Sequence, residues 1–162
     1  MALKHVLLPE DGKGLHLGAF CPLLDSPIAV ISLFIESSPI DNNDHASSSS
    51  KNDQQMVRFR KFACDPEFQR RGVGTRLLVY ALSMARSELN ATMVWCDART
   101  SSHDWYKRRG LDSFGGKSFK DSVEYIRMRI DVCELKGQQY SEGVEHEASQ
   151  IRASIASRHL RI

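Results

Sequence analysis

The segment from Phe62 to Leu78, FACDPEFQRRGVGTRLL, constrains the fold more than any other part of the chain. An alternating stretch ends shortly before Pro66, because proline cannot donate a hydrogen bond to a strand ladder. A polar turn with Gly72 and Gly74 follows. Residues 75–89 then place their apolar side chains on one face of a helix. A strand, a glycine-containing turn and an amphipathic helix in this order predict an α/β arrangement around a sheet.

The remaining periodic segments predict four more strands and one short helix. The run 27–36 is apolar almost throughout and predicts a strand buried on both faces, whereas 122–132 alternates. The full set of predicted strands is 14–21, 27–36, 56–64, 92–98 and 122–132. The short helix is expected to be capped by Ser101 or Ser102, to run through Arg109 and to stop at Gly110.

Two segments predict no part of the packed core. Residues 41–55 contain almost no apolar side chain, so we expect a mobile loop there. The chain becomes polar again from Cys133, with a weak helical pattern at 145–160. We therefore expect one domain over residues 1–132 and a C-terminal extension over residues 133–162.

The distribution of charge indicates an anionic partner for the middle of the chain. Residues 58–129 carry 15 basic and 8 acidic side chains, although the net charge of the whole chain is only +2. Acids are interleaved with the basic residues, so a small phosphorylated ligand fits at least as well as nucleic acid. We expect no nucleic acid among the partners.

Other features of the composition exclude whole classes of protein. The longest apolar run, 28–35, is far too short to span a membrane, and the first residues do not resemble a signal peptide. We therefore expect no membrane partner and a cytoplasmic protein, with the nucleus as the alternative. The four cysteines include no closely spaced pair, so we expect reduced thiols and no metal site.

The turn before the long helix has the chemistry of an anion-binding site. The first amides of a helix lack intrahelical partners and lie at the positive end of its dipole. Gly72 and Gly74 permit close backbone approach, and Arg70 and Arg71 add guanidinium donors suited to phosphate. The segment is neither a Walker loop nor a Rossmann fingerprint, because it lacks the Gly-Lys-Ser/Thr ending and the third glycine.

Two motifs resemble the GNAT superfamily of N-acyltransferases. The acetyl-CoA loop of that family has the pattern Gln/Arg-x-x-Gly-x-Gly/Ala after a strand and a Pro-Glu turn. Here it reads Gln69-Arg70-Arg71-Gly72-Val73-Gly74, preceded by Pro66-Glu67. The segment Trp105-Tyr106-Lys-Arg-Arg-Gly110-Leu111 is similar to the Phe-Tyr-x-x-x-Gly-Phe signature, and the segment from Phe119 resembles the closing strand. The resemblance covers about residues 14–132.

The resemblance implies a fold and an activity. The fold would be an α/β (α+β) GNAT-like domain whose central twisted sheet is mixed, mostly antiparallel and flanked by helices. The activity would be transfer of the acetyl group of acetyl-CoA, as co-substrate, to a primary amine on a small molecule or a peptide, by direct attack in a ternary complex. Relatives usually begin with a strand and helices that wall the acceptor side, and this part looks shortened here. Either Met1–Pro9 retains a remnant of it, or that wall is absent.

The resemblance also implies which residues would bind the cofactor. The pantetheine arm would pair with the backbone of the strand that ends at Phe62, Ala63 and Cys64. The pyrophosphate would bind the loop formed by Gln69, Arg70, Arg71, Gly72, Val73, Gly74 and Thr75. Arg99 stands where many relatives carry an asparagine that contacts the cofactor, and a structural salt bridge is the other interpretation of it.

Tyr106 matches the tyrosine that relatives use as general acid toward the departing thiolate. Proton transfer from a phenol to an alkyl thiolate is uphill by about 2 kcal/mol, so Tyr106 would need a nearby cation or donor such as Arg99 or Arg109. Packing beside Trp105 is the structural alternative. For the base that accepts the amine proton, the residue types leave His16, Asp65 and Asp97 open.

Three functions remain in competition at this point. The first is an N-acetyltransferase; the second is an altered module that binds acyl-CoA or a protein partner without turnover. The third, a nucleic-acid-binding protein, would use the arginines of the central block. Neither the acceptor nor the oligomeric state follows from the sequence, and a homodimer is compatible with it.

Overall fold

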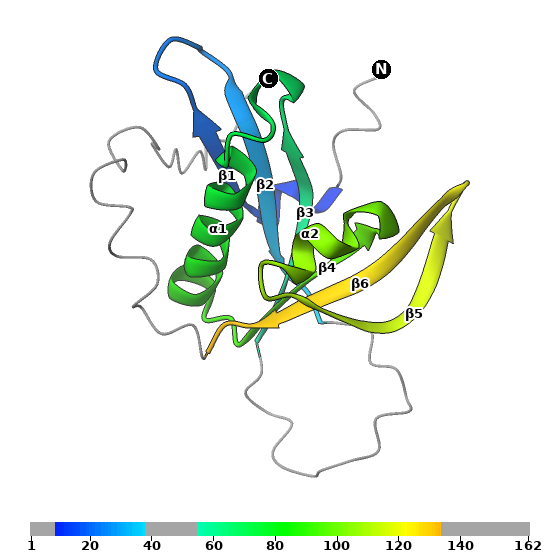
Figure 1. Ribbon diagram of the computed structural model, residues 1–162. Helices are drawn as coiled ribbons and strands as arrows, with labels where there is room; N and C mark the ends of the chain where they lie inside the picture. The colour runs from blue at the N-terminus through cyan, green and yellow to red at the C-terminus, as the bar shows by residue number, and fades with distance from the viewer. Residues whose placement is uncertain (1–8, 38–54, 134–162) are drawn as a thin grey trace.

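The computed structural model describes residues 9–37 and 55–133, which form one open sheet covered on one face by two helices (Figure 1). Apart from their single boundary residues Pro9, Gln55 and Cys133, the expected remnant at Met1–Pro9, the expected loop at 41–55 and the expected extension at 133–162 lie outside the described residues. Within residues 9–37 and 55–133, no helix is long and apolar enough to cross a membrane.

The sheet is mixed and mostly antiparallel, as the resemblance implied. Its six strands lie in the order β1-β2-β3-β4-β6-β5, and only the β3–β4 pair is parallel. The strands are β1 (Leu15–Phe20), β2 (Pro27–Ile35), β3 (Met56–Cys64), β4 (Met93–Arg99), β5 (Asp112–Lys120) and β6 (Val123–Asp131). A parallel pair requires a crossover, which here is a helix between β3 and β4.

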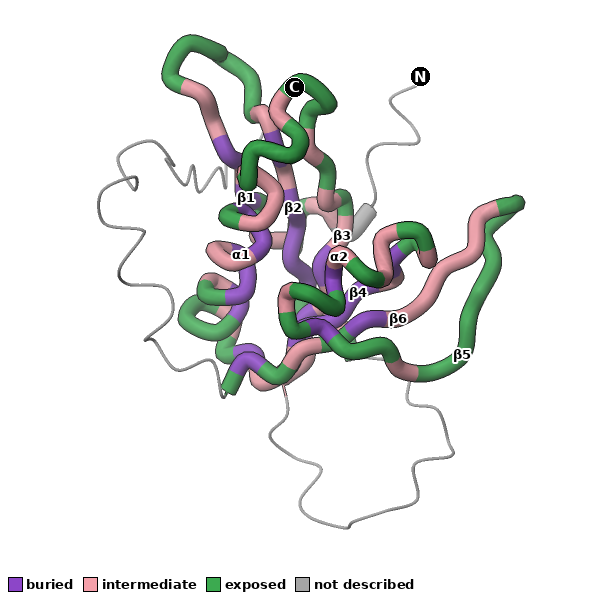
Figure 2. The backbone as a smooth tube through the Cα atoms, in the orientation of Figure 1, coloured by how far each residue is buried: buried purple, intermediate pink, exposed green. Residues whose placement is uncertain are grey.

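That helix, α1 (Val73–Leu89), buries the apolar stripe that its sequence predicted. The stripe packs against β2, β1 and β3 on one face of the sheet. Figure 2 shows the buried residues of α1 and of these strands in purple. Its buried members are Leu77, Leu78, Ala81, Leu82 and Ala85. Each fully buried leucine contributes about 1.5–3 kcal/mol of transfer free energy, so this stripe fixes where the start of α1 lies relative to β3.

β3 and β4 pair only over their first residues. The parallel register joins Met56–Arg58 to Met93–Trp95 and then stops, although both strands continue. β3 contains an irregularity at this point: its register with β2 shifts by one residue, and Lys61 has a φ of 53°. An extra residue of this kind bends a strand and re-aims its side chains. The two strands therefore part, and the edge of β3 toward β4 is left without a strand partner as far as Cys64.

The strand β5 was not predicted from the sequence. Its residues are almost all exposed, Gly115 and Gly116 interrupt any alternation, and its register with β6 shifts between Phe114 and Ser118. Hydrogen bonding to β6, rather than burial, defines this edge strand, so periodicity gave no signal for it. Figure 1 shows β5 and β6 extending together away from the body of the protein.

Short helical segments complete the described chain. They are η2 (Pro9–Lys13), η3 (Pro66–Phe68), η4 (Thr100–Ser102) and α2 (His103–Lys107). Ser102, one of the two residues predicted as the cap, is the N-cap residue of α2, but its side chain makes no capping hydrogen bond. Gly110 follows with a φ of 84°, the left-handed conformation typical of a helix end.

Candidate active site

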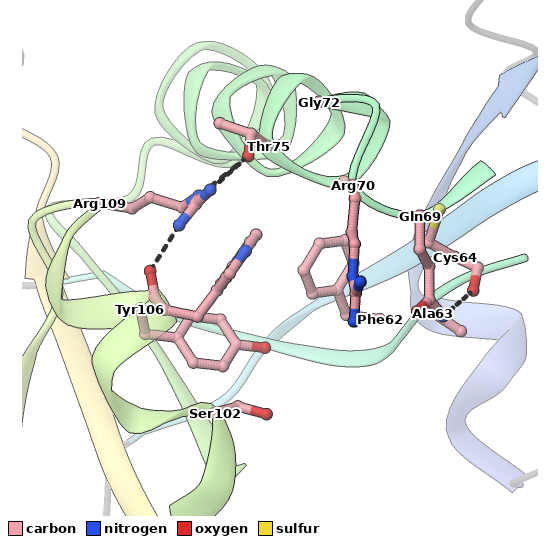
Figure 3. Close-up of a pocket in the computed structure, with 12 residues that line it drawn as sticks. Phe62, Ala63, Cys64, Gln69, Arg70, Gly72, Thr75, Ser102, Tyr106 and Arg109 are labelled. Atoms are coloured by element: carbon pink, nitrogen blue, oxygen red, sulfur yellow. Dashed lines mark hydrogen bonds between the residues drawn. The ribbon is translucent and has the colours of Figure 1, made fainter. Parts of the chain in front are cut away.

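A cavity of about 480 Å³ opens where the end of β3, the start of α1 and α2 meet; we call it the helix-side cavity. Figure 3 shows its side chains converging from these three elements. The lining residues are Phe62, Ala63, Cys64, Gln69, Arg70, Gly72, Gly74, Thr75, Ser102, Trp105, Tyr106 and Arg109. The parting of β3 from β4 and the position of the α1 stripe are what create the space.

The start of α1 borders this cavity through Gly72, Gly74 and Thr75. The first intrahelical hydrogen bond runs from Arg76 N to Gly72 O at 3.0 Å, so the amides of Val73, Gly74 and Thr75 precede the intrahelical ladder. The N-cap residue Gly72 supplies no side-chain cap. These donors, at the positive end of the helix dipole, can hold an anion.

Gly72 is required by backbone conformation and not by space. Its φ is 78°, and a Cβ atom built there would meet nothing within 4 Å. A side chain at this position would therefore strain the turn while still fitting sterically. At Gly74 a Cβ atom would lie 3.6 Å from the ring of Phe62, an ordinary contact.

The turn before α1 is held by local hydrogen bonds. Gln69 Nε2 donates to the carbonyl of Cys64 at 3.0 Å, and the Asp65 carboxylate accepts from the amide of Glu67 at 2.9 Å. Arg70, whose φ is 59°, directs its side chain to the cavity lining. The amides at the start of α1 therefore follow a turn that is held by its own hydrogen bonds.

Aromatic rings form the inner wall. The ring centroids of Phe59 and Tyr106 lie 5.9 Å apart, those of Phe62 and Trp105 5.8 Å apart, and those of Trp105 and Tyr106 5.0 Å apart. Such edge and tilted contacts between aromatic rings are favourable and give this side of the cavity an apolar surface.

Tyr106 combines a buried ring with a hydroxyl directed toward the space between α2 and β3 (Figure 3). Burial raises the pKa of Tyr106 well above its usual value, and the neighbouring Cys96 thiol acts in the same direction. The phenol therefore stays protonated at all physiological pH values and can donate a hydrogen bond into the cavity. Arg99 lies at the exposed end of β4, and Arg109 donates to Thr75 and to the Trp105 carbonyl, so cationic assistance to Tyr106 from either arginine stays a prediction.

Arg109 is a part of the site that the sequence assigned only as a helper. Its Nε and Nη2 atoms donate to Thr75 Oγ1 at 3.0 and 2.7 Å, and its Nη1 donates to the Trp105 carbonyl at 2.7 Å (Figure 3). The guanidinium also stacks on the Trp105 ring at 3.7 Å. Burial and the neighbouring Arg108 lower its pKa, but an arginine remains charged. Arg109 therefore ties the start of α1 to α2 and places a cation beside the cavity.

Nine of the twelve residues proposed from the sequence line this one cavity, and three do not. Arg71 stacks over the ring of Phe68 at 5.6 Å, Val73 packs partly buried against the core, and Arg99 is exposed at the end of β4. The cofactor contacts of these three stay predictions. Two further lining residues, Ser102 and Trp105, received no role from the sequence, and Arg109 was expected only as an aid to Tyr106. The aromatic–arginine pair four positions apart, Trp105 and Arg109, was the available signal for their contact.

The thiols nearest the cavity are poor nucleophiles. Burial and the adjacent Asp65 raise the pKa of Cys64, and burial, reinforced by Asp97, raises that of Cys96. Both therefore stay as thiols at neutral pH. Among the described residues, no group of three or more His, Cys, Asp or Glu side chains could hold a metal ion.

The three candidate bases are all engaged in other contacts. His16 uses both ring nitrogens, with Ser32 Oγ at 2.8 Å and the Asp11 carbonyl at 2.7 Å. Asp97 forms ion pairs with three cations, and Asp65 caps η3. None of them is poised over the helix-side cavity.

Comparison with known proteins gives a family and a fold. Residues 10–111 match the model of the acetyltransferase (GNAT) family. No curated protein matches the chain.

Solved structures similar to this one share its fold at low sequence identity. An acyl-CoA N-acyltransferase from Pseudomonas aeruginosa is 22% identical with a TM-score of 0.52; the match covers 71% of this chain and 66%, just under two thirds, of that one. FeeM, an N-acyl amino acid synthase from uncultured soil microbes, is 13% identical with a TM-score of 0.57, over 83% and 77% of the two chains. A chimeric spermidine N-acetyltransferase from Vibrio cholerae SpeG and hSSAT is 16% identical with a TM-score of 0.55, over 80% and 72%.

Proposed function

This chain belongs to the acetyltransferase (GNAT) family, and from that premise we propose that it is an acetyl-CoA-dependent N-acetyltransferase. The proposed reaction transfers the acetyl group from acetyl-CoA to a primary amine, by direct attack in a ternary complex. The observation that supports it most is one cavity that combines helix-start amides preceding the intrahelical ladder, an open strand edge and a buried tyrosine.

The fit of acetyl-CoA rests on matching chemistry along the cavity. In the proposal, the amides of Val73, Gly74 and Thr75, with Arg70 beside them, hold the pyrophosphate. The peptide groups of Phe62–Cys64, on the strand edge that β4 does not cover, pair with the amides of the pantetheine arm. Each charge-assisted hydrogen bond to the phosphates contributes about 1.5–3 kcal/mol.

The chemical step needs no enzyme nucleophile. The amine nitrogen attacks the thioester carbonyl carbon, the C–N bond forms, the C–S bond breaks, and sulfur leaves as a thiolate that finally takes the proton lost by nitrogen. Tyr106 is proposed to donate a hydrogen bond to the departing sulfur; its raised pKa makes complete proton transfer from the phenol costlier than for an ordinary tyrosine. The aromatic wall keeps water from the thioester.

One observation favours a second candidate function, a module that binds acyl-CoA without turnover. An amine with a pKa near 10.4 costs about 4.6 kcal/mol to deprotonate at pH 7, and the three candidate bases are engaged in other contacts. An enzyme without a free base at the site would use the small fraction of the acceptor amine that is already neutral, or would pass the amine proton to a distant base through a chain of water molecules.

Cofactor binding and turnover separate the candidates. Acetyl-CoA at about 100 times its Kd stabilises a protein by about 2.7 kcal/mol, which raises the Tm by several degrees. A Tm that does not move at saturating acetyl-CoA would refute both candidates. A Tm increase without CoA release over a broad panel of amines would leave only the binding module.

A further inference from the structure

A second cavity lies on the face of the sheet opposite α1; we call it the opposite-face cavity. Its volume is about 450 Å³. Its lining residues are Arg58, Phe59, Arg60, Lys61, Asp97 and Lys120. Arg58 pairs in register with Trp95, so the side chains of Arg58 and Asp97 emerge on the same face, away from the core residues Val57 and Val94.

The two cavities approach each other where β3 and β4 part. Phe59 lines the opposite-face cavity, and its ring lies 5.9 Å from the ring of Tyr106, which lines the helix-side cavity. The register between the strands ends at Arg58 and Trp95, immediately before Phe59. The buried side chain of Phe59 therefore lies between the two cavities, at the point where the strands part.

The charges in this cavity are predominantly positive around a single carboxylate. Asp97 lies within ion-pair distance of Arg58, of Lys120 Nζ at 3.7 Å and of Arg127 Nε at 3.5 Å. Lys120 and Arg127 thus share a partner at long range, and the side chain of Lys120 is 59% exposed. Two of the lining cations, Arg58 and Arg60, meet on the carboxylate of Glu36.

This arrangement discriminates between classes of amine. A second ammonium group on the acceptor would meet Lys120 and Arg127, and the carboxylate of Asp97 already serves three cations. A carboxylate on the acceptor would instead give Lys120 and Arg127 a closer partner than Asp97. When two ligands have the same size, a site of positive electrostatic potential favours the one that carries a negative charge.

We infer that the acceptor is a primary amine that also carries an anionic group. Its carboxylate is bound by Lys120, which lines the opposite-face cavity, and by Arg127, which neighbours the cavity through Asp97, and its amine is directed between β3 and β4. This inference rests on the proposed acetyl transfer and adds the chemical class of its second substrate.

Three amines with the same four-carbon chain test it: 4-aminobutyrate, butylamine and 1,4-diaminobutane. The measured quantity is kcat/KM for CoA release from acetyl-CoA with the full chain. We expect kcat/KM for 4-aminobutyrate to exceed that for butylamine by about tenfold, because its carboxylate gains one partly exposed charge-assisted contact. We expect kcat/KM for 1,4-diaminobutane to be the lowest, because its second ammonium group meets cations.

Lys120→Glu should reduce kcat/KM for 4-aminobutyrate by about fivefold or more and raise that for 1,4-diaminobutane. Lys117→Glu is the matched control. Lys117 lies on the same strand with a similarly exposed side chain, but it pairs with Glu124 and does not line the cavity. The Tm increase caused by acetyl-CoA, measured in both variants, should equal that of the unmodified protein.

The outcomes separate the two proposals. The predicted order, reversed toward the diamine by Lys120→Glu alone, supports the inference. Equal rates, a preference for the diamine, identical behaviour of the two variants, or no turnover of any of the three amines despite cofactor binding would overturn it. Absence of acetyl-CoA binding would instead overturn the proposed function itself.

Discussion

The helix-side cavity and the opposite-face cavity are built from different kinds of groups. The first uses backbone amides, a strand edge and aromatic rings, most of them within one contiguous segment and one short helix. The second uses charged side chains from β3, β4 and β5, and the most distant two, Arg58 and Lys120, are 62 positions apart in the chain. Backbone groups bind the part of a ligand that is the same for every member of a family, whereas dispersed side chains can change the ligand without changing the fold.

This contrast predicts separable defects. Changes on the helix side should alter cofactor binding or the chemical step for every acceptor, and changes on the opposite face should alter only the choice of acceptor. The following experiments test the helix side, from the largest expected effect to the smallest.

Gly72→Glu should give the largest effect. The left-handed backbone costs a non-glycine residue about 1–2 kcal/mol, and the new carboxylate opposes the phosphates at a turn whose hydrogen bonds each contribute about 1.5–3 kcal/mol. We expect acetyl-CoA affinity, measured by titration calorimetry, to fall by about 100-fold or more.

The matched control is Gly116→Glu, at another exposed glycine where a Cβ atom meets nothing within 4 Å and no positive φ is required. Its affinity for acetyl-CoA should be unchanged. Equal affinity in both variants would remove the turn from the binding site.

Tyr106→Phe tests the chemical step. The hydroxyl has no hydrogen-bond partner in the part of the chain that the structure describes, so its removal should leave the free energy of unfolding within about 0.5 kcal/mol of the original. Loss of the donor to the leaving sulfur should lower kcat by about 100-fold with acetyl-CoA affinity unchanged. An unaltered kcat would reduce Tyr106 to a packing residue.

Much of the helix side could be predicted from sequence because its signals are local. The strand, the turn at Gly72 and the apolar stripe of α1 follow one another directly between Met56 and Leu89, so periodicity and glycine placement located them together. Tyr106 required a family resemblance, since nothing local distinguishes a site tyrosine from a packed one.

The rest depended on contacts between distant residues. Nothing near Arg109 indicates that its acceptor is Thr75, 34 positions away. The β5 strand exists because β6 lies beside it, and the cluster around Asp97 exists because three strands bring its cations together. The role of Arg99 came only from its position in the family motif; the structure leaves it exposed and outside the cavity lining, and its cofactor contact stays a prediction.

Thr75→Val tests whether the tie between α1 and α2 supports the cavity. It removes the acceptor of two hydrogen bonds from the Arg109 guanidinium and leaves those donors unsatisfied, so the free energy of unfolding in urea should fall by about 1–3 kcal/mol. Thr75→Ser retains the acceptor oxygen and should retain most of the stability. A similar loss in both variants would show that the methyl group, and not the hydrogen bonds, is what stabilises this contact.

The pH dependence of the free energy of unfolding tests whether solvent is excluded from the core beneath the helix-side cavity. Burial raises the pKa of Cys96 above its unfolded value of 9.0, so the thiol stays neutral in the folded protein while the unfolded chain ionises. Below pH 9 the Cys96 thiol is neutral in both states and does not lower the free energy of unfolding. As the pH rises further, ionisation of the unfolded chain lowers the free energy of unfolding by up to about 1.4 kcal/mol per pH unit for one buried thiol.

Cys96→Ala should remove part of that alkaline loss of stability, measured by urea unfolding at pH 8 to 10.5. Cys133→Ser, at an exposed cysteine, should not. If both variants lose stability with pH as the original does, the thiol of Cys96 is not shielded from solvent.

Backbone amide shifts on titration with coenzyme A test the central claim most directly. The account predicts that in a ¹⁵N-labelled sample the amide resonances of Gly72–Thr75 move most, followed by those of Phe62–Cys64, while those of Arg127 and Arg129 on β6 stay in place. Saturation of binding with the Gly72–Thr75 resonances unmoved would contradict it.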